Sequence, residues 1–380
     1  MRDGWVETPI GDVAQVLSGF AFKSELFNKS EGIPLIRIRD LPKKDSTEAL
    51  YSGSYEDRHV VKKGDFLIGM DGDFHCYEWN GPDALLNQRV CRIQDFKIGR
   101  VVPRYIYFAV NQYLDKIEQD TGYTTVKHIS AKQVLGITIP LPPLPEQKRI
   151  VDLISSVDSY IEALQKQLES AKRSRNAVLH ELLTTGSDDW VVRKLPEVVE
   201  VLDRFRKPVN STEREERKGT IPYYGANGQT GWIDEFIFDE ELVLLGEDAI
   251  DFADPTARKA YLIQGPSWVN NHAHVLRANK TIVNSYFLME SLNAVDYSQY
   301  VSFGTRSKLT QASMNKIKVL VPSMKIQEKT VDLLTNFDEV IAATQKSIGD
   351  SKVLRSGLLS DLLGGEHEFP ESYDKVMGAA

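Results

Sequence analysis

The chain contains one long internal repeat. The segment IPLPPLPEQKRIVDLISSVDSYIEALQKQ, which starts at Ile139, returns without a gap as VLVPSMKIQEKTVDLLTNFDEVIAATQKS, which starts at Val319. Identical residues recur at this shift of 180 positions, among them the triplet Val-Asp-Leu at 151–153 and 331–333. A register held over so many positions predicts two copies of one structural unit.

Each copy of the repeat is predicted to form a long helix. In the first copy, apolar residues recur along one face of the predicted helix and form a seam, which Arg175 interrupts. Arg355 stands at the equivalent place in the second copy. The other seam positions of the first copy are apolar and recur in alternating steps of four and three, as in a coiled coil; they are Ile150, Ile154, Val157, Ile161, Leu164, Leu168, Ala171, Val178 and Leu182. We expect the two helices to pair as an intramolecular antiparallel coiled coil. A plain dimerisation coiled coil is the alternative.

The segments outside the helices are β-rich. The runs IPLIRIRDL, DFLIGMDG and VCRIQDF in the first block, and IPYYGANG, ELVLLGED and AHVLRAN in the second, are typical of short strands ended by Gly, Asp or Asn. We therefore predict an α+β fold in which two β-rich domains are separated by two long helices. The expected boundaries are 1–140 and 187–320 for the domains, 141–186 and 321–366 for the helices, and 367–380 for a C-terminal tail.

Length and composition limit the class of protein. A chain of 380 residues favours two or more domains. No run of eighteen apolar residues is present, and the N-terminus lacks the apolar core of a signal peptide, so we expect a cytoplasmic protein without a membrane span. The net charge of −8 is unusual for a chain that grips DNA alone, because phosphate binding favours a basic excess. If this chain binds DNA, the basic groups must be local or supplied by partner subunits.

Sequence motifs of catalysis are missing from the chain. There is no GxxxxGK[ST] phosphate loop, no Asn-Pro-Pro-aromatic tetrapeptide of an amino-methyltransferase, and no HExxH or other metal-ligand spacing. The cluster Asp65, Asp71 and Asp73 is interpreted as acidic turn residues rather than a nuclease metal site. His272 and His274 alternate along a predicted strand, and we interpret them as a polar contact or a satisfied core pair. The sequence therefore predicts a non-catalytic chain with no metal site.

The order of the motifs carries a family resemblance. The second block, with RFRKPVNSTERE, IPYYGANGQTGWIDEFIFD, LLGEDAI, VNNHAHVLR and GTRSKLTQ, resembles the target-recognition domains of type I restriction-modification specificity subunits. The first block, with LSGFAFKS, IPLIRIRDL and VKKGDFLIGMDGD, looks like another member of the same class. Together with both helices the resemblance covers nearly the whole chain. The first domain has IRIRDL where the second has YYGANG, which implies a different half-site.

The resemblance implies a function and partners. Each domain would read one half of a bipartite double-stranded DNA target, two methyltransferase subunits would dock on the paired helices, and endonuclease-translocase subunits could join. S-adenosylmethionine would then bind the methyltransferase, ATP and Mg²⁺ the endonuclease, and this chain would bind no cofactor. The alternatives are a specificity subunit of a related type II-like methyltransferase and nuclease complex, a coiled-coil scaffold that binds no DNA, or a self-sufficient enzyme.

Candidate contact residues follow from the chemistry of base edges and phosphates, which favours Arg, Lys, Asn and Gln. The DNA-contact candidates are Lys23, Arg37, Arg39, Lys127 and His128 in the first block, and Arg206, Lys207, Tyr223, Asn227, Arg306 and Lys308 in the second, where Gly225 and Gly228 would allow close backbone approach. For any of them a solvated surface position is the alternative. One of Tyr223 and Tyr224 is expected in the core, and Asn87, Asn270 and Asn271 are expected to satisfy local backbone. Candidates for partner contacts are polar residues identical in both helices: Gln147, Asp158, Lys166, Gln327, Asp338 and Lys346.

Overall fold

The computed structural model of the chain describes residues 2–72, 74–120, 127–184, 190–254, 256–301, 307–370 and 373. The chain divides into two compact units. Unit 1 comprises Met1–Leu164 and Ser347–Ala380, and unit 2 comprises Gln165–Lys346. Each unit thus combines one β-rich block with a part of each long helix.

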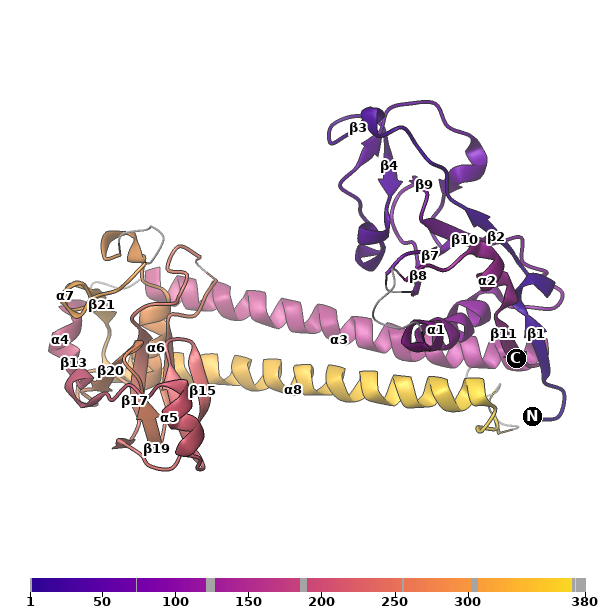
Figure 1. Cartoon of the computed structure of the whole chain (residues 1–380). Coiled ribbons are helices and arrows are strands. Elements are labelled where there is room, and N and C mark those ends of the chain that lie inside the picture. Colours follow the sequence, from indigo (N-terminus) through magenta and orange to yellow (C-terminus); the bar gives the residue numbers. More distant parts are fainter. Residues whose placement is uncertain are drawn as a thin grey trace. The chain divides into compact units, whose positions relative to one another are not determined.

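The two predicted helices are confirmed. Helix α3 spans Leu144–Thr184 and helix α8 spans Met324–Gly364, each with 41 residues, and Figure 1 shows them as the two longest ribbons. Gly365 follows α8 with a φ of 73°, a left-handed conformation that glycine adopts readily at a helix end.

The helices pair in opposite directions. In unit 1, Arg355 of α8 hydrogen-bonds to Asp158 of α3, and in unit 2, Arg175 of α3 hydrogen-bonds to Asp338 of α8. A rising residue number on α3 therefore matches a falling number on α8. The two arginines are the seam interruptions of the sequence, so each interruption is an ionic contact between the helices.

Unit 1 is built from three sheets. A four-stranded sheet has the order β2-β10-β7-β8, and a five-stranded sheet has the order β3-β5-β4-β9-β6. The third sheet pairs β1 with β11, next to the start of α3. The bounds are β1 Val6–Pro9, β2 Gln15–Ser18, β3 Phe27–Asn28, β4 Ile33–Ile36, β5 Leu50–Tyr51, β6 Val60–Val61, β7 Phe66–Gly69, β8 Cys76–Glu78, β9 Ala84–Leu86, β10 Val90–Gln94 and β11 Thr138–Leu141, with helices α1 Pro103–Asp120 and α2 Ala131–Gly136.

Unit 2 repeats this arrangement, except that its second sheet has four strands in place of five. Its sheets have the orders β13-β20-β17-β18, β15-β14-β19-β16 and β12-β21, and the parallel pair β14·β19 corresponds to the parallel pair β4·β9 of unit 1. The bounds are β12 Val191–Lys194, β13 Val199–Val201, β14 Ile221–Gly225, β15 Gly228–Ile233, β16 Phe238–Asp239, β17 Leu242–Gly246, β18 Ala260–Ile263, β19 Pro266–Val269, β20 Ala273–Ala278 and β21 Lys318–Val321, with helices α4 Leu195–Val198, α5 Ser211–Glu216, α6 Ser285–Asn293 and α7 Gln311–Met314. The internal repeat therefore extends from the helices to both β-rich blocks.

Each of the six predicted runs contains a strand, but one was predicted too long. The run IPLIRIRDL is a strand only through Ile36 and continues as a 3-10 helix over Ile38–Lys43. The carboxylate of Asp40 accepts hydrogen bonds from the backbone N–H and Nε of Arg37, which ends the extended conformation at Arg37. Such a local side-chain contact competes with sheet pairing.

A large core in unit 1 joins the sheet to the helices. Tyr105 and Ile106 of α1 pack there with Ile150 and Ile154 of α3 and Leu362 of α8, all of them buried. The first seam residues of α3 are therefore part of the core of the β-rich block. No helix among the described residues is long and apolar enough to cross a bilayer.

Candidate nucleic-acid interface

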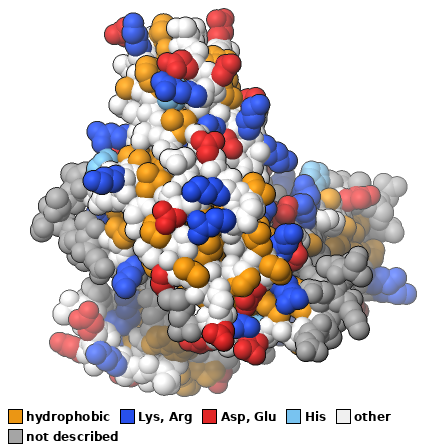
Figure 2. Space-filling model, turned by 90° about the vertical axis from the view of Figure 1, so that its right-hand side faces the viewer, with side chains coloured by type: hydrophobic (Ala, Val, Ile, Leu, Met, Phe, Trp, Pro, Cys, Tyr) orange, Lys and Arg blue, Asp and Glu red, His pale blue; other side chains and the backbone are white. Residues whose placement is uncertain are grey.

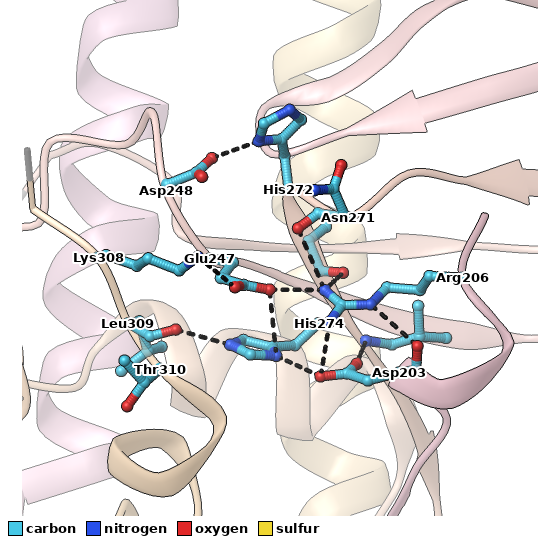
Figure 3. Close-up of polar contacts among 12 residues, drawn as sticks. Asp203, Arg206, Glu247, Asp248, Asn271, His272, His274, Lys308, Leu309 and Thr310 are labelled. Carbon is cyan, nitrogen blue, oxygen red and sulfur yellow. Dashed lines mark hydrogen bonds and ion pairs between the residues drawn. The ribbon is translucent and has the colours of Figure 1, made fainter. Parts of the chain in front are cut away.

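A polar network lies where β17 ends and β20 begins, in the middle of the β13-β20-β17-β18 sheet of unit 2, and Figure 3 shows its members. His274 of β20 is buried, and its Nδ1 lies 2.6 Å from Oδ2 of Asp203. Its Nε2 lies 2.8 Å from the carbonyl oxygen of Leu309, and because a carbonyl can only accept, Nε2 donates there. The network therefore ties the segment before α7 to the sheet.

Arg206 is a central member of this network. Its Nη1 donates to Oε2 of Glu247 at 2.7 Å and to the carbonyl oxygen of Ala273 at 2.8 Å, and its Nε donates to the carbonyl oxygen of Asp203 at 3.2 Å. Burial opposes ionisation of Glu247, but hydrogen bonds from Arg206 and Lys308 hold the pKa of its carboxyl below the ordinary value of 4.5. These contacts engage the guanidinium, whose side chain is 15% exposed, and the role of Arg206 as a DNA contact stays a prediction. We assign Arg206 to positioning the network.

Replacing Arg206 by alanine should lower the free energy of unfolding of unit 2 by about 2–4 kcal/mol, because it removes charge-assisted hydrogen bonds and leaves buried acceptors on Glu247 and Ala273 without this donor. Urea denaturation measures the loss. The matched control is Arg204→Ala, whose side chain is exposed and should change stability by less than about 0.5 kcal/mol. An Arg206→Ala chain that is as stable as the wild type, but loses discrimination at one base position, would show that Arg206 reads a base and does not position the network.

A polar hollow opens beside this network. Its volume is about 420 Å³, and its lining residues are Pro208, Val209, Asn210, Arg214, Tyr223, Asn270, Asn271 and His272. Asn210, Asn271 and His272 are exposed, and they offer amide and imidazole groups that can pair with base edges. Nδ1 of His272 lies 2.7 Å from Oδ1 of Asp248, which orients the ring.

Tyr223 belongs to the core and not to the exposed surface. Its side chain is 1% exposed, and its hydroxyl hydrogen-bonds to both the backbone N–H and the carbonyl oxygen of Val209. The guanidinium of Arg214 covers its ring at 4.6 Å. Alternation along β14 predicted that one of the two tyrosines is buried, and it is Tyr223. Burial therefore overturns the choice of Tyr223 as a DNA contact.

The other predicted contacts of unit 2 lie around the hairpin of β14 and β15 and near α7. Gly225 is buried and its carbonyl accepts from the hydroxyl of Tyr261, whereas Gly228 has a φ of 114° in the tight turn. Asn227 is exposed and donates to the carbonyl oxygen of Ala249 at 2.9 Å. Two lysines are exposed: Lys207, and Lys308, whose Nζ lies 3.0 Å from Glu247. Arg306 lies outside the described residues.

The asparagines of VNNHAHV divide between two roles. Asn270 is buried and its Oδ1 accepts from the backbone N–H of His272 at 2.8 Å, which is the local backbone role that the sequence predicted. The side chain of Asn271 is instead exposed on the hollow. Sequence reasoning missed Asn271 and His272 as contact candidates. The signal was their position directly before a buried strand, where the chain leaves the core.

The predicted contacts of unit 1 fall into three places. Arg37 is half-buried with its Nε 3.3 Å from Asp40, and Arg39 is exposed on the same 3-10 helix. Nδ1 of the exposed His128 lies 2.6 Å from Oδ1 of Asp71, and the carbonyl oxygen of Lys127 accepts from Gly72. Lys23 is exposed beside a separate cavity.

Two of the three carboxylates in the acidic cluster of the first block are described, and both are paired. Asp65 pairs with Arg92 and accepts from the backbone N–H of Lys62, and Asp71 pairs with Arg89 as well as His128. Asp73 lies outside the described residues. The two described carboxylates therefore make ion pairs next to strand β7.

Two glutamines predicted as partner contacts instead make hydrogen bonds inside the chain. Gln147 is buried; its Oε1 accepts from Val102 N–H at 2.8 Å, and its Nε2 donates to the carbonyl oxygens of Arg100 and Pro142. Gln327 repeats this arrangement with Asn284, Ile282 and Pro322. Their identity in both copies reflects this structural role, so burial corrects their assignment to partner binding. Asp158 and Asp338 make the interhelical ion pairs, and Lys166 and Lys346 are exposed.

Comparison with known proteins places this geometry in a family. The family model described as the type I restriction modification DNA specificity domain matches residues 2–173 and 187–349. The type I restriction enzyme EcoBI specificity subunit of Escherichia coli is 39% identical over 206 residues, which are 51% of this chain and 43% of that protein. A putative type I restriction enzyme specificity subunit of Haemophilus influenzae is 30% identical over 165 residues, 43% of this chain and 40% of that protein.

These matches span less than half the length of either curated relative. A crystal structure of the type I restriction-modification S subunit from M. genitalium shares the fold, with a TM-score of 0.61, 18% identity, and coverage of 97% of this chain and 96% of that chain. The family model matches both repeats and most of the chain. The chain therefore belongs to the family of type I restriction modification DNA specificity domains.

Proposed function

We propose that this chain is the sequence-specific DNA-binding subunit of a type I restriction-modification complex, in which each unit reads one half of a bipartite duplex target. The observation that carries this proposal is a repeated topology with different exposed polar groups. Unit 2 presents Asn271 and His272 at its hollow, whereas unit 1 presents Arg39 and His128. One scaffold with two sets of exposed donors and acceptors suits the reading of two different sequences.

Partner subunits supply the chemistry in this proposal. Adenine methyltransferase subunits would hold S-adenosylmethionine, endonuclease subunits would hold ATP and Mg²⁺, and this chain would be non-catalytic. The charge of the chain supports a complex in which partner subunits contribute to phosphate binding. The net charge is −8, and on the face in Figure 2 the Lys and Arg side chains are interspersed with Asp and Glu. Partners that add positive charge around the duplex would strengthen phosphate binding.

A gel shift with the full chain tests the proposal. The chain alone should bind duplex DNA weakly, and a cognate methyltransferase should tighten binding to one bipartite sequence. Incubating the pure chain with DNA, S-adenosylmethionine and Mg²⁺ should give neither methylation nor cleavage. Turnover by the pure chain would show that it is an enzyme, and a failure to bind any duplex with its partner would favour a scaffold.

Replacing Asn271 by alanine should relax discrimination at one base position of the target by about 1–3 kcal/mol, because an exposed amide can pair with a base edge. Competition binding of the complex to single-substitution duplexes measures the change. The comparison variant is Lys207→Ala, an exposed cation that should weaken all sequences uniformly and reduce the salt dependence of binding. A uniform loss in Asn271→Ala would assign Asn271 to the DNA backbone instead.

A further inference from the structure

Unit 1 contains a cavity that the proposed contacts do not explain. Its volume is about 340 Å³, near the lower end of the range of small-molecule sites, about 300–1,000 Å³. Phe20, Tyr51, Tyr55 and His59 supply its rings, and Lys23 and Glu56 supply its charges. All of these residues belong to unit 1.

Two of the rings are unusually open to solvent. Phe20 is 47% exposed and Tyr55 is 44% exposed. Phe20 is also fixed in place, since its backbone N–H donates to the carbonyl oxygen of Leu86 at 2.9 Å and its own carbonyl accepts from Gln88 at 2.8 Å. An isolated β-bridge to Asn87 thus holds an exposed phenyl ring at the cavity, where a planar ligand could stack on it without rearranging the backbone.

His59 forms the buried wall of the cavity. The residue is 4% exposed, and neither Nδ1 nor Nε2 has a hydrogen-bond partner in the described structure. Its ring centroid lies 5.4 Å from that of Phe20 and 6.4 Å from that of Phe22. Buried polar atoms without partners are rare and call for an explanation. A ligand with heteroatoms on its edge would supply the missing partners.

Charge at the cavity favours a ligand that carries an anion beside its ring. Burial, reinforced by the positive charge of Arg58, lowers the pKa of His59, so the ring is neutral near pH 7 and offers one donor and one acceptor. The carboxylate of Glu56 makes an exposed ion pair with Arg58, with 2.9 Å between Oε2 and Nε. Lys23 is the cation among the lining residues, where a phosphate could approach.

We propose that this cavity binds a single unstacked nucleobase of the bound DNA, stacked on Phe20 and Tyr55, with its edge toward His59 and its phosphate toward Lys23. The proposal rests on the proposed function of the chain as a DNA reader. A base inside an intact duplex cannot offer its face to these rings, so the ligand is an unpaired or extruded base. Aromatic side chains bind such bases with little sequence preference, because every base has a π-face.

The first test uses the full chain and two DNA duplexes that differ at one bulged nucleotide, which carries either 2-aminopurine or an abasic residue. The base-containing bulge should bind more tightly, and stacking should change the fluorescence of 2-aminopurine. Phe20→Ala should weaken the base-containing bulge about 5-fold to 150-fold. Phe236→Ala, an equally exposed aromatic residue of unit 2, should leave it unchanged. Equal binding of the two bulges by the wild type would overturn the proposal.

A second variant separates binding from folding. His59→Phe keeps an aromatic ring at the cavity wall and removes both nitrogens, so it should fold and weaken the base-containing bulge about 2-fold to 10-fold. Phe20→Ala and His59→Phe should leave the affinity for a fully paired duplex unchanged. Losses of the same size on the abasic and paired duplexes would assign both residues to structure and refute the base site.

The cavity can also be tested if the chain binds no DNA, in which case the proposed function fails by itself. Ligand-observed NMR then uses dAMP and deoxyribose 5-phosphate as probes. Binding of dAMP that is lost in Phe20→Ala and retained in Phe236→Ala would support the base site, whereas equal signals from the two probes would reject it.

Discussion

Replacing Arg175 by methionine should lower the free energy of unfolding of unit 2 by about 3 kcal/mol or more, because it leaves a buried carboxylate without its main partner. Nη2 of Arg175 donates to Oε1 of Glu290 at 2.8 Å, and its Nε donates to Oδ1 of Asp338 at 2.6 Å. The side chain of Glu290 is only 4% exposed. Arg258, 2.9 Å from the same oxygen, remains and limits the loss.

The internal repeat supplies the matched control. Arg355 occupies the equivalent position, but its partner Asp158 is 35% exposed, and its guanidinium lies 5.8 Å from the centre of the Phe108 ring. Arg355→Met should therefore cost unit 1 about 1 kcal/mol or less. Hydrogen exchange read separately in the two units measures both losses. Equal losses in the two variants would show that the buried Glu290 does not decide the cost.

A double variant isolates the buried charge. Arg175→Met combined with Glu290→Leu should recover much of the stability, because removing both partners leaves no unpaired charge in the core. The pKa of Asp338 provides a further check. Burial opposes ionisation of Asp338, but hydrogen bonds from Arg175 and Tyr286 lower its pKa below 3.8. Its contribution to stability is therefore present above about pH 4 and is lost as the pH falls through the lowered value.

The long helices could be predicted from sequence because their signals are local. Heptad spacing indicated α3, and the repeat carried the prediction to α8. The seam interruption at Arg175 was visible, but its partners were not, since Glu290 and Asp338 lie far away in sequence. Asp338 was predicted as a partner contact because it is identical in both copies. A residue can be identical in both copies because it makes the same ion pair inside the chain, and not only because it contacts a partner.

The candidate site was less predictable than the fold. Alternation along β14 implied that one of two adjacent tyrosines is buried, but which one depends on Val209, which hydrogen-bonds to Tyr223 from another segment. The composition of RFRKPVN suggested an exposed basic segment. Arg206 of this segment instead donates hydrogen bonds to Glu247 and to the carbonyl oxygen of Ala273. Residue type gives the chemistry available. Contacts with residues distant in sequence decide which side-chain donors and acceptors remain available to a ligand.

Exchanging the first β-rich block for that of another family member should replace one half of the methylated sequence and keep the other half. The physical reason is that each unit has its own core, with Tyr105 and Ile106 in one and Phe287 and Leu288 in the other. Exposed side chains of the two units can then change independently. Several altered base contacts, each with a discrimination of about 1–3 kcal/mol, suffice to abolish recognition of the original half-site.

The position of the junction decides whether such a chimera folds. A cut after Pro140 would divide β11, because Leu141, which pairs with Val6 of β1, would come from a different protein than the rest of the strand. A cut after Pro143 keeps β11 whole. The incoming block must also offer Gln147 the N–H and carbonyl groups that residues 100 and 102 supply here, because the glutamine is buried. Methylome sequencing of cells carrying the later junction should reveal a hybrid bipartite target. A target altered in both halves would mean that the two units do not read DNA independently.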